Sequence, residues 1–342
     1  MKLWDFSSKD IGIDLGTTNI LMTLKGKGIV LREPAVVALD QVTKEIVATG
    51  KEAKEMLGRT PENIRAIMPM SEGVIADLTA TSLMLKNMMR KICRKYNTGK
   101  PRVVVSVPFE ISEVEERAVE ETFLQSGARE VYLVDEPISA AIGAGLNVIE
   151  PEGKMVLDIG GGTSEAAIIS YNGIVTSNSV KIAGNVIDNE IVEYLKNQLN
   201  IVIGLATAEN LKIELGSAEP LVTEITKEVR GRDVEDGLPR NITISSKQVE
   251  NAMKKPVAEI VETVITTLSQ MPPELAGDII KNGIYLTGGG ALIKNLDNVI
   301  ASKTGIKVYI ADTPLDCVAL GTGKILDNID KYKEVLLNHK NK

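Results

Sequence analysis

A strand-and-glycine motif occurs twice in this chain, and it limits the fold more than any other feature of the sequence. The first copy is the apolar run Ile11–Leu15, which contains Asp14 and is followed by Gly-Thr-Thr. The second is residues 155–159, with Asp158, three glycines and Thr163. Another apolar run follows each turn, so each copy predicts a β-hairpin. Two copies in 342 residues predict two similar α/β domains with mixed sheets and a cleft between them.

Apolar periodicity predicts the elements that accompany the hairpins. Ser112 and Glu115 have the spacing of a helix capping box. The glycine- and proline-containing stretch 145–153 predicts the join between the domains, and the polar stretch 224–241 predicts a hairpin or loop. The expected strands are 102–107, 131–134, 284–287 and 308–311, and the expected helices are 79–96, 112–123, 139–145, 185–199, 206–215, 246–270 and one from 318 onward.

Composition removes several classes of function. The single histidine, His339, excludes Ser/His/Asp triads and histidine-rich metal sites, and the distant Cys93 and Cys317 exclude zinc ribbons. A net charge of −7 and an aromatic content of 3% argue against a nucleic-acid partner. Neither a P-loop nor a dinucleotide fingerprint occurs. The start of the chain lacks the apolar core of a signal peptide, and no long apolar run occurs, so we expect a cytoplasmic protein.

The two turns have the chemistry of phosphate binding. Glycine lets backbone amides approach an anion, and threonine hydroxyls add further donors. Asp14 and Asp158 precede the glycines, where carboxylates would hold Mg²⁺ through water. Taken singly, each turn is also explained as a simple tight turn. Because both turns occur at matching places in two domains, the sequence favours a phosphate clamp.

Two further features suit a nucleoside, although each has a structural alternative. Residues 287–291 lead from a strand through three glycines toward a helix expected at Leu292, where bare backbone would admit a flat ring or would form an ordinary turn. Glu209 and Lys212 are three residues apart on one helix face. They would hold a ribose and an adenine edge, or form a surface ion pair.

Together these segments resemble a known superfamily. The stretches that begin at Asp14, Asp158 and Leu286 look like the phosphate-1, phosphate-2 and adenosine motifs of the actin, Hsp70 and sugar-kinase ATPases. More narrowly, the chain resembles the bacterial actin MreB family from about Ile11 to Gly323. The stretches that carry this resemblance are 28–34, 52–61, 73–77, 101–105, 135–137 and 229–234.

The resemblance implies a duplicated actin-like (ribonuclease H-like) fold with four subdomains around a nucleotide cleft. Domain I would span 1–147 with a small insert at about 33–66. Domain II would span 148–316 with an insert at about 183–245. The last part, 317–342, would be a C-terminal helix that returns to domain I, followed by a basic tail.

The resemblance also implies the roles of individual residues. Glu136 would orient the attacking water with help from Thr163, although a carboxylate at a helix start is also stabilised by the helix dipole. Asp14 and Asp158 would hold Mg²⁺ through water. The residues expected to bind ATP or ADP are Gly16, Thr17, Thr18, Asn19, Gly160, Gly161, Gly162, Thr163, Glu209, Asn210, Lys212, Gly288, Gly289, Gly290 and Ala291.

Members of this family form head-to-tail filaments, pair them antiparallel and lie on the inner face of the membrane. In this chain Arg90, Lys91, Arg94 and Lys95 lie in the stretch 86–102, which has no acidic residue. The stretch would make charge-driven contact with anionic lipid, or it is a solvated helix end. Many members have an apolar loop tip where this chain has the polar stretch 96–101, so insertion by that loop is not expected. Further contact is expected from an apolar tip and a basic tail, namely Leu3, Trp4, Phe6, Lys331, Lys333, Lys340 and Lys342.

The sequence departs from the family at Asn185 and Val186, where an acidic pair is usual. This change puts a ribose or metal-water contact in question. The function expected from the resemblance is an ATPase that polymerises into membrane-associated filaments and determines cell shape, with membrane-bound cell-shape proteins as further partners. The alternatives are a scaffold that binds ATP without hydrolysing it, and a monomeric ATPase or kinase of the same superfamily.

Overall fold

The computed structural model describes residues 9–71, 73–109 and 111–337, and it divides into two compact units. Unit 1 runs to Glu150 and also contains Tyr171–Gly173 and the chain from Asp316 onward. Unit 2 contains Pro151–Ser170 and Ile174–Leu315. The domain ranges expected from the sequence stay a prediction.

A five-stranded mixed sheet forms the centre of unit 1, with the order β3-β2-β1-β9-β10. The first three strands form an antiparallel meander, and β9 and β10 continue the sheet in parallel with β1. The apolar runs predicted from the sequence form these strands because nearly every side chain of β1 and β9 is buried. The strands are β1 (Ile11–Leu15), β2 (Asn19–Leu24), β3 (Gly28–Pro34), β9 (Arg102–Val107) and β10 (Glu130–Asp135).

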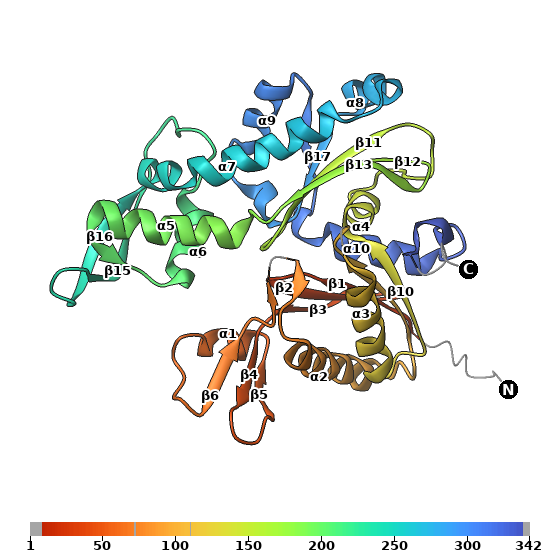
Figure 1. Ribbon diagram of the computed structural model, residues 1–342, viewed down its shortest axis with the longest axis horizontal. Coiled ribbons are helices and arrows are strands. Elements are labelled where there is room, and N and C mark those ends of the chain that lie inside the picture. The colour runs from red at the N-terminus through yellow and green to blue at the C-terminus, as the bar shows by residue number, and fades with distance from the viewer. Residues whose placement is uncertain (1–8, 72, 110, 338–342) are drawn as a thin grey trace. The chain divides into compact units, whose positions relative to one another are not determined.

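Helices cover both faces of the unit 1 sheet (Figure 1). Two of them, α2 (Leu78–Tyr96) and α3 (Glu113–Gln125), pack on one face, and α4 (Glu136–Gly143) and α10 (Cys317–Asp327) pack on the other. The capping box expected at Ser112 is present at the start of α3.

The helices α4 and α10 approach closely because small residues line their contact. A Cβ atom placed on Gly321 of α10 would lie 1.9 Å from the carbonyl oxygen of Ser139 on α4. A methyl group has no room there, so only glycine allows this packing. The contact fixes the position of α4, whose first residue is Glu136.

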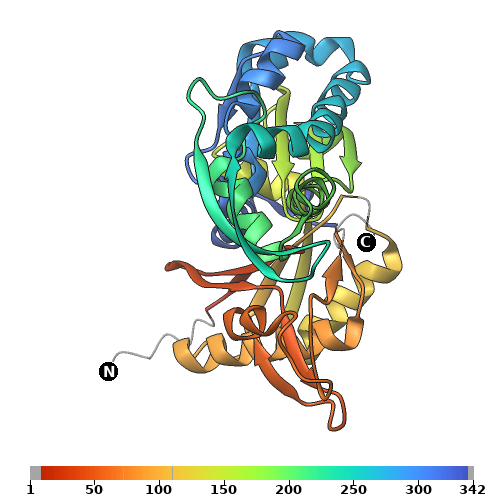
Figure 2. The same cartoon turned by 90° about the vertical axis from the view of Figure 1, so that its left-hand side faces the viewer.

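Unit 1 also contains a small subdomain set apart from its main sheet in both views (Figures 1 and 2). It has a three-stranded antiparallel sheet in the order β5-β4-β6 and one short helix. The small elements of unit 1 are β4 (Val37–Asp40), β5 (Ile46–Thr49), α1 (Lys51–Met56), β6 (Ile64–Ile67), β7 (Met70–Ser71), β8 (Val74–Ile75) and the 3₁₀ turn η4 (Lys333–Val335).

Unit 2 repeats the architecture of the first sheet. Its order is β13-β12-β11-β17-β18, again with an antiparallel hairpin at the centre and two parallel strands beside it. Asp14 and Asp158 therefore occupy equivalent places, each on the central strand of its own sheet. The strands are β11 (Lys154–Ile159), β12 (Ser164–Ser170), β13 (Gly173–Val180), β17 (Ile284–Thr287) and β18 (Val308–Ile310).

The remaining elements of unit 2 build its core and a second small sheet, β14-β15-β16. The polar stretch 224–241 falls within the hairpin of that sheet. The elements are α5 (Gly184–Leu199), β14 (Ile201–Val202), α6 (Leu205–Leu215), β15 (Thr226–Asp233), β16 (Pro239–Ser245), α7 (Ser246–Ser269), η1 (Pro273–Leu275), α8 (Ala276–Asn282), η2 (Gly289–Leu292), α9 (Leu296–Thr304) and η3 (Pro314–Asp316).

The predicted fold class is confirmed, and one predicted helix start is wrong. The helix expected at Leu292 begins at Leu296, because a 3₁₀ turn, Gly289–Leu292, comes first. Within the described ranges, the helices are all too short or too polar to cross a bilayer. The apolar tip at Leu3, Trp4 and Phe6 and the basic residues Lys340 and Lys342 lie outside the described residues.

Candidate functional site

The first glycine turn joins β1 to β2 in unit 1. Asp14 is 9% exposed, and a Cβ placed on Gly16 would lie 2.7 Å from the carbonyl oxygen of Asn19 and 3.5 Å from Oδ1 of Asp14. The turn is therefore too tight for a side chain at Gly16. The hydroxyl of Thr17 accepts a hydrogen bond from the amide of Gly73 at 3.1 Å, which ties the turn to the segment before β8.

The second glycine turn joins β11 to β12 in unit 2. The amide of Gly160 donates to the carbonyl oxygen of Thr163 at 2.9 Å and closes the turn. The carbonyl oxygens of Gly160 and Gly161 accept hydrogen bonds from the first two amides of α5, those of Gly184 at 3.2 Å and Asn185 at 2.8 Å. The first amides of any helix have no partner within the helix, and those of α5 hold the loop here.

Asp158 is the buried carboxylate of this turn. It is 4% exposed, and the hydroxyl of Thr287 on the neighbouring strand donates to its Oδ1 at 2.5 Å. Burial raises the pKa of Asp158 from 3.8 to about 6, and the bond from Thr287 opposes that rise. An ionised carboxylate in such a place is unfavourable unless a cation compensates it.

A magnesium ion bound mostly by water fits these residues. In the described part of the chain, no three His, Cys, Asp or Glu side chains gather closely enough to form a metal cluster. Mg²⁺ commonly keeps several waters and takes one or two carboxylates together with phosphate oxygens. The carboxylate oxygens of Asp14 in unit 1 and of Asp158 in unit 2 are of the type that Mg²⁺ binds, and a magnesium role for either stays a prediction. When bound, such an ion would neutralise phosphate charge.

The glycines after β17 are explained by packing against β11. A Cβ on Gly288, which has φ +76°, would lie 2.3 Å from the carbonyl oxygen of Ile159, and one on Gly290 would lie 2.1 Å from the Ile159 side chain. These residues must be glycine whether or not a ligand binds. A nucleoside role for Gly288, Gly289, Gly290 and Ala291 stays a prediction.

The expected nucleoside residues Glu209, Asn210 and Lys212 lie on α6. Asn210 is exposed, and Glu209 and Lys212 are half-buried. The ammonium group of Lys212 donates to the carbonyl oxygen of Gly184 at 2.9 Å and pairs with Oδ1 of Asp188 at 2.9 Å. Sequence reasoning gave no role to Gly184 or Asp188, because Gly184 lies 28 residues from Lys212 and the contact leaves no local pattern.

Glu136 is the first residue of α4 and follows β10 directly. This is a helix start, where a carboxylate is stabilised by the unpaired amides and the helix dipole. The structure therefore divides the predicted residues between the two units. Unit 1 holds Asp14, Glu136 and the turn 16–19, whereas the turn 160–163, α6 and the remaining predicted residues belong to unit 2.

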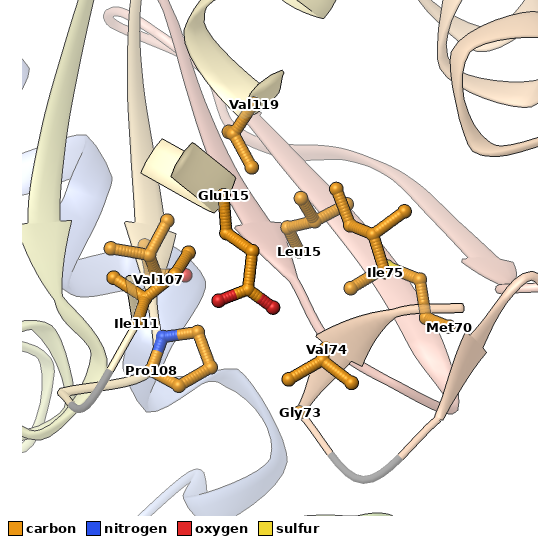
Figure 3. Close-up of a pocket in the computed structure, with 11 residues that line it drawn as sticks. Leu15, Met70, Gly73, Val74, Ile75, Val107, Pro108, Ile111, Glu115 and Val119 are labelled. Carbon is orange, nitrogen blue, oxygen red and sulfur yellow. The ribbon is translucent and has the colours of Figure 1, made fainter. Parts of the chain in front are cut away.

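A pocket adjoins the first turn in unit 1 (Figure 3). Its walls are mostly apolar, and they come from the ends of β1 and β9, from the β7–β8 segment and from α3. The carboxylate of Glu115 points into the pocket, and it accepts hydrogen bonds from both the amide and the hydroxyl of Ser112. Glu115 is thus occupied as part of the capping box.

The predicted membrane patch lies near the end of α2. Arg90, Lys91, Arg94 and Lys95 are all exposed, and Lys91 donates to the hydroxyl of Thr49 at 3.3 Å. All four side chains therefore reach solvent at one end of unit 1.

The structure adds two lysines to this end of α2. Around Tyr96, the last residue of the helix, the ammonium groups of Lys27 and Lys95 lie 5.0 Å and 5.3 Å from the ring centre. Lys9 donates to the backbone carbonyl of Tyr96 at 3.1 Å. The sequence interval 86–102 does not contain Lys9 or Lys27.

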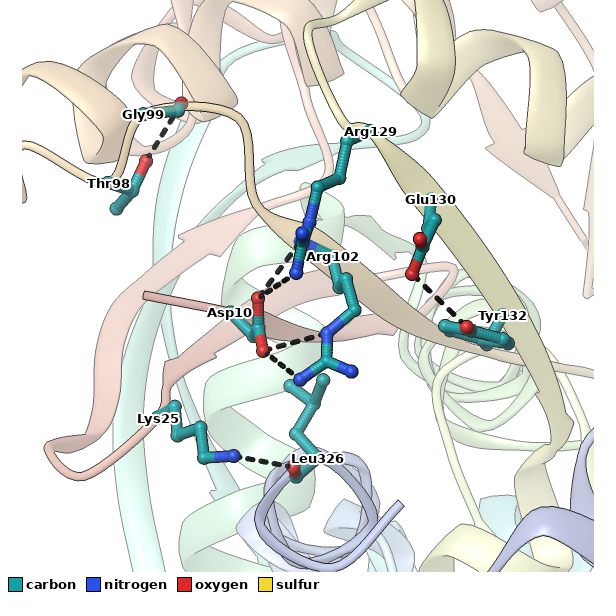
Figure 4. A network of polar contacts seen from close by, with 9 residues as sticks. All are labelled: Asp10, Lys25, Thr98, Gly99, Arg102, Arg129, Glu130, Tyr132 and Leu326. Carbon is teal, nitrogen blue, oxygen red and sulfur yellow. Dashed lines mark hydrogen bonds and ion pairs between the residues drawn. The ribbon is translucent and has the colours of Figure 1, made fainter. Parts of the chain in front are cut away.

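Near these lysines the buried carboxylate of Asp10 is neutralised. Asp10 is 2% exposed and accepts hydrogen bonds from the backbone amide and the guanidinium of Arg102, and Arg129 lies 3.9 Å away (Figure 4). This carboxylate raises the pKa of Arg102, because the hydrogen bond favours the charged guanidinium. The network joins the starts of β1, β9 and β10, and it leaves the surrounding lysines with excess positive charge.

The amino-acid sequence matches one protein family along most of its length. The model described as "MreB/Mbl protein" matches residues 8–334. The cell shape-determining protein Mbl of Bacillus subtilis (strain 168) is 48% identical over 95% of this chain and 97% of its own length. The cell shape-determining protein MreB of Escherichia coli (strain K12) is 49% identical over 95% of each chain.

Solved structures agree with this match. The structure of MreB5 of Spiroplasma citri bound to AMPPNP has a TM-score of 0.89 and 38% identity, over 96% of this chain and 98% of that one. The same protein bound to ADP gives a TM-score of 0.90. A MamK double helical filament gives a TM-score of 0.78 at 19% identity over 93% of this chain and 98% of that one, which supports the actin-like fold alone.

Proposed function

The chain belongs to the MreB/Mbl protein family, and on that premise we propose that it is a bacterial actin that binds and hydrolyses ATP. We propose further that it assembles head to tail into filaments that pair antiparallel, and that these filaments contribute to cell shape at the inner face of the cell membrane. Support comes from relatives that are named as cell shape-determining proteins and from the nucleotides in the solved MreB5 structures.

The observation that carries the nucleotide proposal is the buried carboxylate beside a glycine turn. Asp158 is held by Thr287 next to the glycines 160–162, and burial raises its pKa. This arrangement suits a divalent cation that accompanies a phosphate chain. Asp14 has the equivalent place in the other sheet, beside Gly16 and the two threonines. In our proposal Glu209, Asn210 and the segment 288–291 receive the nucleoside.

For hydrolysis we propose that Glu136 orients the attacking water and that Thr163 assists. Phosphoryl transfer depends on charge neutralisation and a positioned water more than on covalent chemistry, so a single fixed carboxylate is sufficient. The close contact of α4 with α10 supports this role, because it limits the movement of the helix that carries Glu136.

The test is phosphate release from Mg·ATP at increasing protein concentration. A rate per molecule that rises with concentration, together with filaments in electron micrographs, is the expected result. A constant rate without filaments would favour a monomeric ATPase or kinase. ATP binding and filaments without phosphate release would favour a scaffold that does not hydrolyse ATP.

For the membrane we propose peripheral contact by charge at the end of α2. Each basic residue near an anionic surface contributes about 1 kcal/mol, so four or more give measurable binding. Neutralising Arg90, Lys91, Arg94 and Lys95 should reduce sedimentation with phosphatidylglycerol vesicles. The matched control neutralises four exposed lysines of unit 2, namely Lys247, Lys254, Lys255 and Lys303. Equal loss in both variants would show a general charge effect and contradict this location.

A further inference from the structure

We infer that Lys212 is a positioning residue for the second glycine turn, and that it acts on this loop through the backbone of α5. This inference rests on the proposed function, because it assumes that the glycines 160–162 bind phosphate. It assigns to Lys212 an action different from the nucleoside contact expected from the sequence. Asp188 holds Lys212 in place for this action.

The hydrogen bonds to α5 determine the direction in which the loop amides point. The carbonyl oxygens of Gly160 and Gly161 point toward the start of α5, since they accept hydrogen bonds from Gly184 and Asn185. In a planar trans peptide the N–H of the next residue points opposite to the carbonyl. The N–H groups of Gly161 and Gly162 are therefore directed away from α5, as donors for an anion.

One peptide plane, between Gly184 and Asn185, links this loop to Lys212. The carbonyl oxygen of Gly184 accepts from the ammonium group of Lys212 at 2.9 Å. The N–H of Asn185 belongs to the same plane and donates to Gly161 at 2.8 Å. Lys212 therefore fixes the orientation of the peptide that holds the loop. Because linked hydrogen bonds polarise one another, its charge also strengthens the donor at Gly162.

An ion pair and close packing restrain the side chain of Lys212 itself. Its side chain is 15% exposed, and it pairs at 2.9 Å with Asp188, whose side chain is 10% exposed and lies one turn into α5. Space is also limited, because a Cβ on Gly184 would lie 3.2 Å from the Lys212 nitrogen and 3.4 Å from the Gly160 carbonyl oxygen. Three successive glycines have little conformational preference of their own, so the loop depends on this external support.

The test uses Lys212→Met, which keeps the length of the side chain and removes its charge. Lys196→Met is the matched control, because Lys196 also forms an ion pair in unit 2, but with Glu193 on the exposed side of α5. The first measurement is hydrogen exchange in nucleotide-free protein of the amides that hold the loop, namely those of Gly160, Gly184 and Asn185. We expect these amides to exchange about tenfold faster in Lys212→Met, the size associated with losing a charged hydrogen bond, and no change in the control.

The second measurement separates the loop from the nucleoside. Mg·tripolyphosphate, which has no nucleoside, and Mg·AMPPNP each compete with a fluorescent ADP analogue. We expect Lys212→Met to lose about tenfold in affinity for both competitors. If tripolyphosphate affinity and loop exchange are unchanged while AMPPNP affinity falls, Lys212 is a nucleoside ligand only and the inference is overturned.

Two further results complete the test. If the wild-type protein binds neither competitor, the proposed nucleotide function fails, and the inference fails with it. If Lys212→Met does not fold, Asp188→Asn replaces it, since that change keeps Lys212 but weakens its restraint. We then expect a smaller loss of tripolyphosphate affinity, about threefold, and unchanged affinity would overturn the inference. Lys212→Arg, which keeps the charge, should recover part of the lost affinity.

Discussion

The buried carboxylate of Asp158 leads to a prediction about stability as well as binding. In nucleotide-free protein at neutral pH, Asp158→Asn should unfold at higher urea concentration than the wild type. The asparagine oxygen still accepts from Thr287, and the substitution removes a charge from a site that is 4% exposed. A residue placed for function would then lower the stability of the empty protein.

The pKa shift gives the expected difference in the free energy of unfolding between the variant and the wild type. Burial raises the pKa of Asp158 from 3.8 to about 6, a difference of about two units, which corresponds to about 3 kcal/mol. The pKa of Asp158 is higher in the folded protein than in the unfolded chain, so ionisation of Asp158 lowers the stability of the folded protein. Its protonated form contributes stability fully below pH 3.8, and this contribution is lost as the pH rises through 6. The two proteins should therefore be about equally stable near pH 4 and differ most at pH 7.

The assay is urea unfolding in EDTA between pH 4 and 8, followed by circular dichroism. Asp327→Asn, an exposed aspartate at the end of α10, is the control and should show no such pH-dependent gain. Adding Mg·AMPPNP should reverse the order, because a ligand held at a hundred times its Kd stabilises the folded state by about 2.7 kcal/mol and the variant should bind it weakly. A constant difference between the variant and the wild type from pH 4 to 8 would refute the reasoning.

Three other outcomes are expected. Glu136→Gln should bind Mg·AMPPNP as the wild type does and release phosphate at least a hundredfold more slowly, and retained turnover would contradict its assigned role. Gly321→Ala should lower the free energy of unfolding by about 1–3 kcal/mol, because its Cβ would lie 1.9 Å from a carbonyl oxygen. Gly277→Ala in α8, with nothing within 4 Å, should not destabilise the protein. Two lysines lower the pKa of Glu152 from 4.5 to about 2, so the stability that Glu152→Gln loses at pH 7 should shrink as the pH falls through that range.

The sequence predicted the fold class and the two hairpins because their signals are local. Alternating apolar runs, an aspartate and a glycine turn lie within about ten residues of one another, and buried parallel strands are continuous apolar runs. The strands β3 to β6 were not predicted, since they are short or partly exposed and their pattern is weak. The contact between Lys212 and Gly184 spans 28 residues and that between Asp10 and Arg102 spans 92, so neither leaves a local pattern.

The glycines after β17 show how a motif can mislead. From sequence they were explained by a ligand against bare backbone or by a turn. The structure gives a packing reason, because Gly288 and Gly290 lie against Ile159 with no room for a Cβ. The identity of these residues cannot distinguish the two explanations, since both require glycine. The position of the neighbouring strand β11 shows that packing is one reason for the glycines. Packing therefore requires these glycines by itself, and the binding of Mg·AMPPNP tests whether they also contact a nucleoside.

The two turns are equivalent in topology but are held by different means. Asp14 lies beside Ser106 in its sheet and Asp158 beside Thr287, so the duplicated strands have the same register. In the first turn Thr17 accepts a hydrogen bond from a distant amide through its own side chain. The second turn has glycine at 160–162, where no side chain can make such a contact, and the carbonyl groups of Gly160 and Gly161 are held by α5 instead.

This difference has a consequence for mutation. The first turn should depend mainly on its own residues, since the Thr17 hydroxyl makes the contact directly. The second should be sensitive to changes on α5 and α6, whose residues Gly184, Asp188 and Lys212 surround it without belonging to it. Both hairpins of the duplicated fold thus have a carboxylate before a glycine turn, but different residues hold each turn in place. Changes far along the chain from the glycines can therefore alter the second turn and leave the first intact.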